Sequence, residues 1–173
     1  MSKYNPNSPR TIRGKLFEQL TCERLALSMS HPNCYEIIRT REDWLAKIHP
    51  GIVKEQLDLL ESMWGDIKLT STINPSNHFW IECCSVKYNP TRISKRKVRN
   101  FTEQYGYDAK WYAFKWETDE EIHYVPSVTF NAWIKKATTT DQKDFYTFTK
   151  DQFLTINKRI VGTKNFVSEI LLG

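Results

Sequence analysis

The stretch from Gly65 to Lys87 constrains the fold most, because it reads as two apolar strands joined by a turn. The connection between them, Thr70 to Asn77, is rich in Thr, Ser, Asn and Pro, the residues typical of turns. A hairpin over this stretch would bring Asp66 close to Glu82. A carboxylate in an apolar strand is costly unless it is paired, protonated or bound to a metal. The hairpin therefore predicts an ion-paired or exposed pair of acids, or a site for a hard cation.

A family signature can be compared with these residues. Asp66, followed by Glu82-Cys83-Cys84, resembles the Asp…Glu-x-Lys signature of the PD-(D/E)XK nuclease superfamily. The order and spacing are most similar to those of the archaeal Holliday-junction resolvases, including Ser85 after the signature. Because the bare acidic pattern is weak, the resemblance depends on its flanking segments.

The flanking segments extend the resemblance to roughly residues 10–30 and 64–125. Arg13 to Glu18 resembles the helix that supplies an additional acidic residue in these enzymes. Val98 to Trp116 is similar to the helix, glycine turn and strand that follow the signature. The resemblance implies an α/β fold, with a restriction-endonuclease-like mixed β-sheet flanked by helices.

The resemblance also implies a reaction, the metal-dependent hydrolysis of DNA phosphodiester bonds. Asp66, Glu82 and the backbone carbonyl of Cys83 would hold Mg²⁺, with Mn²⁺ as an alternative, and Glu18 would complete the site. The substrate implied is a four-way junction or other branched DNA, and the assembly implied is a homodimer that cuts two strands symmetrically.

Cys84 departs from the family pattern, because the signature has a lysine at this position. A thiol is neutral near pH 7 and too soft for Mg²⁺, so it replaces neither the charge nor the donor. Three explanations stay open: a deliberate substitution, a naturally inactive relative that binds DNA, or a lysine recruited from elsewhere, with Lys87 and Lys68 as candidates. Of these we favour a loss of rate with metal binding retained. The candidate catalytic residues are Glu18, Asp66, Glu82 and Cys84.

Six basic residues and no acid lie between positions 87 and 99. Such a run is commonly a solvated face. Here it follows the signature strand directly and continues into a helix that we expect to begin near Ser94, a residue suited to an N-cap. Cationic side chains beside a helix start are suited to phosphates. The candidate DNA-binding residues are Lys87, Arg92, Lys95, Arg96, Lys97 and Arg99.

Length and charge set the organisation that we expect. The 173 residues suffice for one domain with a buried core, and the net charge of +5 favours a polyanionic partner. We expect a flexible arm over 1–12 and one nuclease-like domain over 13–173, in which 34–63 is a helical insertion. No apolar run is long enough to cross a bilayer, and four cysteines without zinc spacing favour reduced thiols. We expect a cytoplasmic protein, either nucleoid-associated or viral.

The local patterns predict further elements around the hairpin. Helices are expected over 13–29, 41–48, 50–64, from about 94 to 106, 131–136 and 151–160, and strands over 34–38, 109–116, 122–128 and 145–148. Three alternative functions stay open: a sequence-specific homing or restriction endonuclease of the same fold, an inactive DNA-binding protein, and an RNA-directed nuclease.

Overall fold

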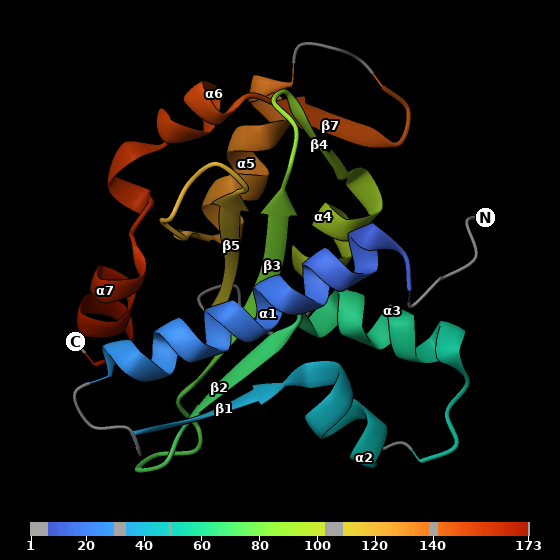
Figure 1. Cartoon of the computed structure of the whole chain (residues 1–173), viewed down its shortest axis with the longest axis vertical. Helices are drawn as coiled ribbons and strands as arrows, with labels where there is room; N and C mark the ends of the chain where they lie inside the picture. Colours follow the sequence, from blue (N-terminus) through green and yellow to red (C-terminus); the bar gives the residue numbers. More distant parts are fainter. Residues whose placement is uncertain (1–6, 30–33, 49, 103–108, 139–141, 173) are drawn as a thin grey trace.

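The computed structural model describes residues 7–29, 34–48, 50–102, 109–138 and 142–172. Its central feature is a five-stranded mixed sheet in the order β1-β2-β3-β5-β6, beside a two-stranded sheet of β4 and β7 (Figure 1). The strands are β1 (Tyr35–Arg39), β2 (Ile67–Ser71), β3 (His78–Val86), β4 (Thr91–Ser94), β5 (Lys110–Trp116), β6 (His123–Pro126) and β7 (Phe145–Phe148). The helical segments are α1 (Pro9–Ser28), η1 (Thr40–Leu45), α2 (Ala46–Ile48), α3 (Lys54–Trp64), α4 (Lys95–Thr102), α5 (Ser127–Ala137), α6 (Lys150–Leu154), η3 (Asn157–Arg159), α7 (Thr163–Asn165) and η4 (Phe166–Leu171).

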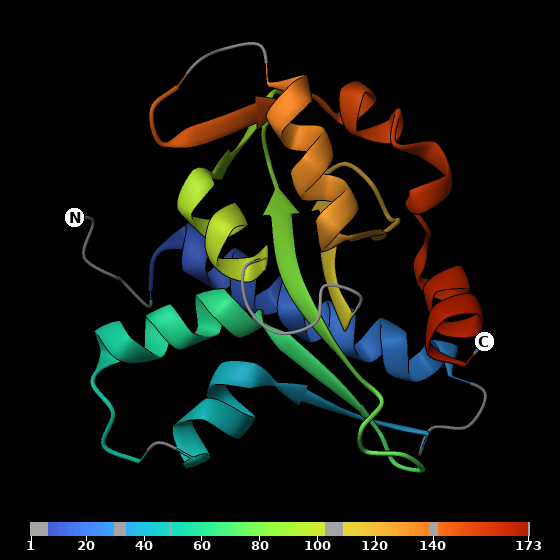
Figure 2. The same cartoon turned by 180° about the vertical axis from the view of Figure 1, so that it is seen from behind.

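The predicted mixed sheet flanked by helices is confirmed. β2 and β3 form the expected antiparallel hairpin, with Ile67 opposite Ile81. β3 pairs in parallel with β5, which requires a crossover, and α4 lies in that connection. Helix α1 crosses one face of the sheet, whereas α4 and α5 cover the other (Figures 1 and 2).

Alternation along the strands divides the apolar side chains between two cores, one on each face of the sheet. The core beneath α1 contains Phe17 and Leu25 of this helix packed on Ile67, Ile81 and neighbouring strand residues. The core beneath α4 and α5 is aromatic. Its fully buried rings are Phe101, Tyr112, Phe114, Phe130, Phe148 and Phe153. Because both faces are covered, the charged residues Glu82 of β3 and Lys110 of β5 are buried.

The first helix begins earlier than expected. Pro9 stands at its first turn and the Ser8 hydroxyl accepts a hydrogen bond from the Thr11 N–H at 3.2 Å, which is a regular N-cap. Residues 9–12, predicted as part of a flexible arm, are therefore helical, and the rest of that arm up to residue 6 lies outside the described residues. The predicted helix end at Gly106 also lies outside them.

The segment 34–63, predicted as a helical insertion, contributes a strand as well as helices. The expected strand near Cys34 to Ile38 is confirmed as β1, which forms the edge of the main sheet by pairing with β2. Residues 50–53, expected to be helical, precede α3 instead. Thr91 to Ser94 form β4, which pairs with the confirmed strand β7.

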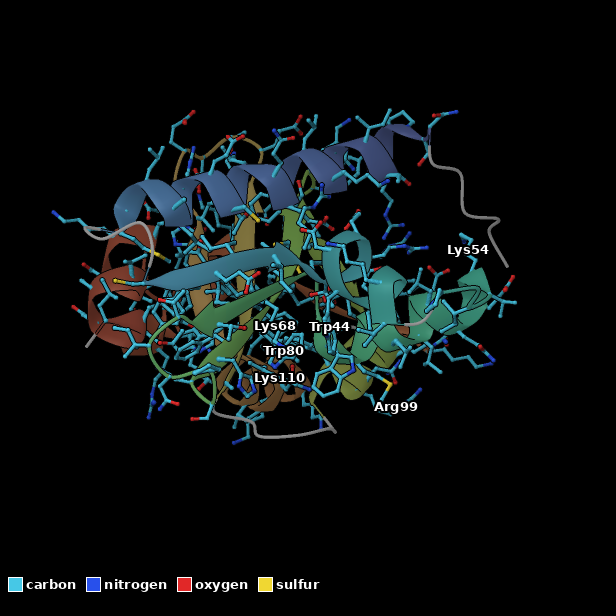
Figure 3. All side chains as sticks on the ribbon, turned by 90° about the horizontal axis from the view of Figure 1, so that it is seen from below. Trp44, Lys54, Lys68, Trp80, Arg99 and Lys110 are labelled. Atoms are coloured by element: carbon cyan, nitrogen blue, oxygen red, sulfur yellow. The ribbon has the colours of Figure 1, made fainter. Side chains whose placement is uncertain are left out.

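An aromatic cluster fixes this segment to the sheet. Trp44 of η1 and Trp64 of α3 pack on Trp80 of β3, with ring centroids 5.3 Å and 4.8 Å from it. The Lys68 ammonium lies 4.8 Å from the Trp44 ring and 5.0 Å from the Trp80 ring (Figure 3). These contacts hold η1 and α3 against the strands that carry the two candidate acids.

A buried lysine joins α3 to α4. Lys110 of β5 is fully buried, and its ammonium donates to the carbonyls of Met63 at 3.0 Å and Phe101 at 2.8 Å. Carbonyls at the last turn of a helix carry partial negative charge and lack a hydrogen-bond partner within the helix. The Lys110 ammonium therefore supplies a donor to one such carbonyl at the end of α3 and to one at the end of α4. Within the described residues, no helix is long and apolar enough to cross a membrane.

Candidate active site

Asp66 and Glu82 line the same pocket, as the predicted hairpin requires. Asp66 stands between Gly65, which ends α3, and the start of β2. Its side chain accepts a hydrogen bond from the Cys83 N–H at 2.8 Å, and its own N–H donates to the Ile81 carbonyl at 2.8 Å. Asp66 is 9% exposed and Glu82 is 6% exposed, so both carboxyl groups are buried.

Gly65 is required for this placement. Its φ of 86° and ψ of −175° fall in a region that is essentially restricted to glycine. A Cβ at this position would lie 2.8 Å from the Ile81 carbonyl oxygen. The glycine therefore lets the chain leave α3 and enter β2 with Asp66 directed at the neighbouring strand.

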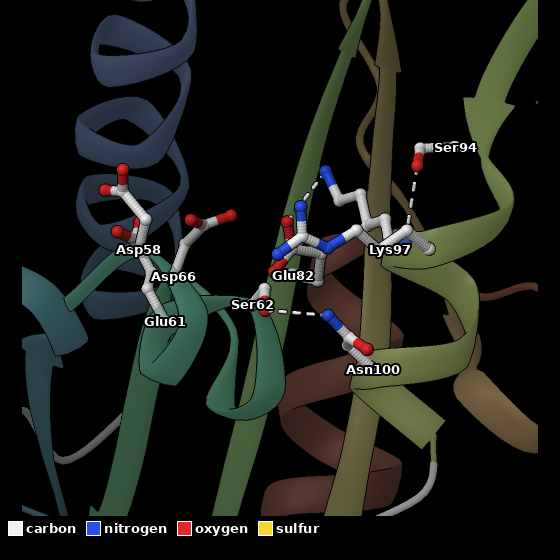
Figure 4. Close-up of a pocket in the computed structure, with 9 residues that line it drawn as sticks. Asp58, Glu61, Ser62, Asp66, Glu82, Ser94, Lys97 and Asn100 are labelled. Carbon is white, nitrogen blue, oxygen red and sulfur yellow. Dashed lines mark hydrogen bonds and ion pairs between the residues drawn. The ribbon is translucent and has the colours of Figure 1, made fainter. Parts of the chain in front are cut away.

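Two further acids reach the same place from helices. Oxygen atoms of Glu18 on α1, Glu61 on α3 and Asp66 lie within 4.8 Å of one another. Glu61 and Asp66 also form one wall of a pocket of about 360 Å³ (Figure 4). Its lining consists of Asp58, Glu61, Ser62, Asp66, Glu82, Ser94, Arg96, Lys97 and Asn100.

Burial and mutual repulsion raise the pKa values of the clustered acids. Loss of solvent raises the pKa of Asp66 well above its ordinary value, and the charge of Glu82 raises it further. Loss of solvent also raises the pKa of Glu61 to about 8, with the neighbouring Asp66 as the next cause. A shared proton or a bound cation relieves this repulsion.

Two arginines form ion pairs with the acids that reach the site from helices α1 and α3. Arg39 of β1 pairs with Glu18 at 2.5 Å. Arg41 of η1 contacts Asp58 at 2.6 Å and Glu61 at 3.0 Å. Both arginines belong to the segment 34–63, so this segment contributes charge to the site in addition to covering the sheet.

A lysine from α4 completes the constellation. The Lys97 ammonium lies 2.7 Å from Oε1 of Glu82 (Figure 4). The Ser94 hydroxyl accepts a hydrogen bond from the Lys97 N–H at 3.4 Å, which confirms the predicted helix start and places Lys97 in the first turn. Burial disfavours the charge of Lys97, but the neighbouring acids Glu82 and Asp66 outweigh it and hold its pKa well above the usual value.

Cys84, which stands where the signature that the sequence resembles has a lysine, lies beside Lys97. Burial raises the pKa of the Cys84 thiol to about 12, so the thiol is neutral and the local cation is Lys97. The two lysines that the sequence offered as replacements are placed elsewhere. Lys68 lies over the tryptophan rings, and Lys87 is exposed with its ammonium 5.7 Å from the Tyr88 ring.

The other members of the basic run point in several directions. Arg92 stacks on Phe145, and Lys95 lies over Tyr146. Arg96 lines the acidic pocket, whereas Arg99 is exposed. Their role in DNA binding stays a prediction.

The donor set fits a hard divalent cation. Several carboxyl oxygens converge at a pocket that opens to solvent, and oxygen ligands suit Mg²⁺ and Mn²⁺. Glu18, Glu61, Asp66 and Glu82 are the side chains available to hold such an ion. The predicted contribution of the Cys83 carbonyl stays a prediction.

The sequence did not single out Glu61, nor did it assign Lys97 to the acids. Glu61 occurs on an amphipathic helix, where an acid is ordinarily solvated. The position of Glu61, four residues before Gly65, was a signal for its role. A helix that ends at Gly65 directs its last turn, which includes Glu61, toward Asp66. For Lys97, the Ser94 cap fixes its place in the helix, but its distance from Glu82 depends on how α4 packs.

Comparisons with known proteins reveal a distant structural similarity. No family model matches the chain, and no curated protein matches it either. Among solved structures, the chain is similar to Hjc, a Holliday junction resolvase from the archaeal hyperthermophile Archaeoglobus fulgidus. The TM-score is 0.47 at 15% identity, over 83% of this chain and 88% of that one.

Proposed function

We propose that this protein is a metal-dependent endonuclease that hydrolyses phosphodiester bonds in DNA. The observation that carries the proposal is the meeting of Asp66, Glu82 and the Lys97 ammonium, with Lys97 2.7 Å from Glu82, at a pocket that further acids line. This set resembles the acids and lysine of the nuclease signature, with a lysine supplied by α4 where the chain has Cys84.

The residues of the chain have distinct parts in the proposed reaction. A divalent ion held by the acids would offset the charge of the phosphate and lower the pKa of a bound water. The Cys83 N–H fixes the orientation of Asp66. Lys97 orients Glu82 and offers a donor to the phosphate or the attacking water, which stabilises charge that develops in the transition state.

Branched DNA is the substrate class that we propose, with a homodimer as the active assembly. Two symmetric cuts require two active sites, and the described residues of one chain present one acidic pocket of this kind. The net charge of +5 is consistent with a nucleic-acid partner.

Cleavage of labelled four-way junction, linear duplex and single strand with Mg²⁺ tests the proposal. We expect cutting by the native chain and its loss in Asp66→Asn, which keeps the shape of the side chain but removes a charge. Preferential cutting of the duplex would favour a restriction or homing nuclease. If Asp66→Asn cuts as well as the native chain, the acidic pocket is not the active site. If the native chain binds DNA but cuts none of the substrates, the protein is a DNA-binding protein without nuclease activity.

Cys84→Lys provides the matched comparison for the role of the thiol. If Lys97 supplies the required cation, the native chain cuts without this change. Activity that appears only in Cys84→Lys would instead identify Cys84 as a disabling residue.

A further inference from the structure

A second pocket, of about 270 Å³, adjoins the acidic one. It lies between the start of α1, the end of β3, β4 and the start of α4. Its lining consists of Arg10, Arg13, Gly14, Cys83, Cys84, Ser85, Val86, Thr91, Arg92, Ile93, Ser94, Lys97, Phe114 and Phe145. Four cations from three elements therefore face one space, and no acidic residue is present in this lining. We call it the basic pocket.

The cations of the basic pocket are largely unneutralised. Among the described residues, no carboxylate pairs with Arg10, Arg13 or Arg92, whereas the arginines Arg39 and Arg41 near the acidic site are both paired. The Arg92 guanidinium lies 4.6 Å from the centre of the Phe145 ring, which restricts its orientation. Guanidinium groups donate two parallel hydrogen bonds to phosphate, so unpaired arginines in a pocket suit that anion.

Lys97 and Ser94 line both pockets. The Lys97 side chain thus forms the boundary between a space lined by carboxyl groups and a space lined by guanidinium groups. A single nucleic-acid strand presents phosphates at short, regular intervals, so one phosphate in the acidic pocket leaves its neighbour near the basic pocket.

We propose that the basic pocket binds the backbone phosphate adjacent to the one that is cut. The strand would cross from one pocket to the other over Lys97, with Arg10, Arg13 and Arg92 as the phosphate ligands. This inference rests on the proposed function and adds a specific subsite to it. It also assigns a role to Arg10 and Arg13, which lie outside the basic run at 87–99.

The surroundings strengthen such an interaction. Val86, Ile93 and Phe114 are buried apolar residues in the lining and Arg13 is half-buried, whereas Arg10 and Arg92 are exposed, so the reduced screening applies to Arg13. Ser85 and Thr91 add hydroxyl groups. Because phosphate contacts carry no base information, the subsite positions the strand without choosing a sequence.

Binding measured without cleavage tests the subsite. Fluorescence anisotropy of labelled junction and duplex, without divalent ions, would be followed against salt for the native chain and Arg13→Ala/Arg92→Ala. The slope of log affinity against log salt should become shallower by about 0.9 for each phosphate that the variant no longer neutralises. Lys164→Ala is the matched control, since this cation lines a separate pocket with Arg24 and Leu27, near the end of α1.

Neutral methylphosphonate groups, placed one at a time along the labelled strand, identify the phosphate concerned. In the native chain we expect one position next to the cut to weaken binding at least threefold. In Arg13→Ala/Arg92→Ala, which keeps only Arg10 of the three arginines, that position should weaken binding much less. The assignment would be overturned if the methylphosphonate weakened binding equally in the native chain and in Arg13→Ala/Arg92→Ala. It would also be overturned if Lys164→Ala changed the salt slope as much as the arginine variant does.

The outcomes separate this inference from the proposed function. If nothing is cut but the arginine variant shows the shallower salt slope and a reduced response to one methylphosphonate position, the basic pocket binds DNA phosphate and the nuclease proposal fails. If cutting is retained while the arginine variant binds and responds like the native chain, the nuclease stands and the subsite is refuted. Circular dichroism and a thermal melt establish that each variant folds.

Discussion

Replacing Lys97 with Met tests the most specific feature of the site. The Lys97 ammonium lies 2.7 Å from Glu82, whose side chain is 8% exposed, while the Lys97 side chain is 32% exposed. At an effective dielectric constant of about 20, the gross attraction at this distance is roughly 6 kcal/mol. Desolvation offsets most of it, and removing one partner of a fully buried pair costs ~3–5 kcal/mol. Because Lys97 is partly exposed, we expect a loss of about 2 kcal/mol of stability in urea unfolding.

The effect on the rate should be larger than the effect on metal binding. Loss of one preorganised charge-stabilising donor typically lowers the rate of a reaction ~100-fold to 1000-fold. We expect a fall of this size in single-turnover cleavage at saturating Mg²⁺. Binding of Mn²⁺ by calorimetry should be unchanged or tighter, since the acids lose a competing cation.

Two comparisons make the test decisive. Lys95→Met removes a charge from the same helix turn, at a residue whose ammonium lies over Tyr146, and should leave the rate within a few-fold of native. Lys97→Met/Cys84→Lys moves the cation onto β3 and should restore part of the lost rate. A folded Lys97→Met protein that cuts as fast as the native chain would refute the assignment of Lys97.

Three further predictions concern the framework of the site. Gly65→Ala should destabilise the protein by at least ~1–3 kcal/mol in urea, because of the strained backbone and the close approach to the Ile81 carbonyl, and a loss below about 0.5 kcal/mol would contradict this. Burial lowers the pKa of Lys110 to about 8, whereas in the unfolded chain it stays near its ordinary value of about 10.4, so the folded state loses this proton first as the pH rises. The free energy of unfolding of the native chain, minus that of Lys110→Met, should therefore be independent of pH below about pH 8. Above pH 8 this difference should rise by up to ~1.4 kcal/mol per pH unit. A difference that stays constant up to about pH 10 would refute the lowered pKa. Trp44→Ala should cost about 2 kcal/mol in thermal unfolding because its ring no longer packs on Trp80, and an unchanged melt would mean that η1 is not fixed by this ring.

The sequence determined the local parts of this protein. Strand patterning around a turn placed Asp66 near Glu82, because strand period and hairpin register are properties of neighbouring residues. The strands β1, β5 and β7 and the Ser94 helix start were predicted for the same reason. The start of α1 was not, since the Ser8 cap and Pro9 were assigned to a flexible arm.

The tertiary structure alone decided which residues join the two acids. Glu61 comes from a helix that the sequence treated as a cover, and its distance from Asp66 depends on the direction in which the chain leaves Gly65. Lys97 was one of six cations in a run, and packing of α4 against the sheet selected it to contact Glu82. Contacts of this kind join segments far apart in the chain, and no local pattern encodes the distance between them.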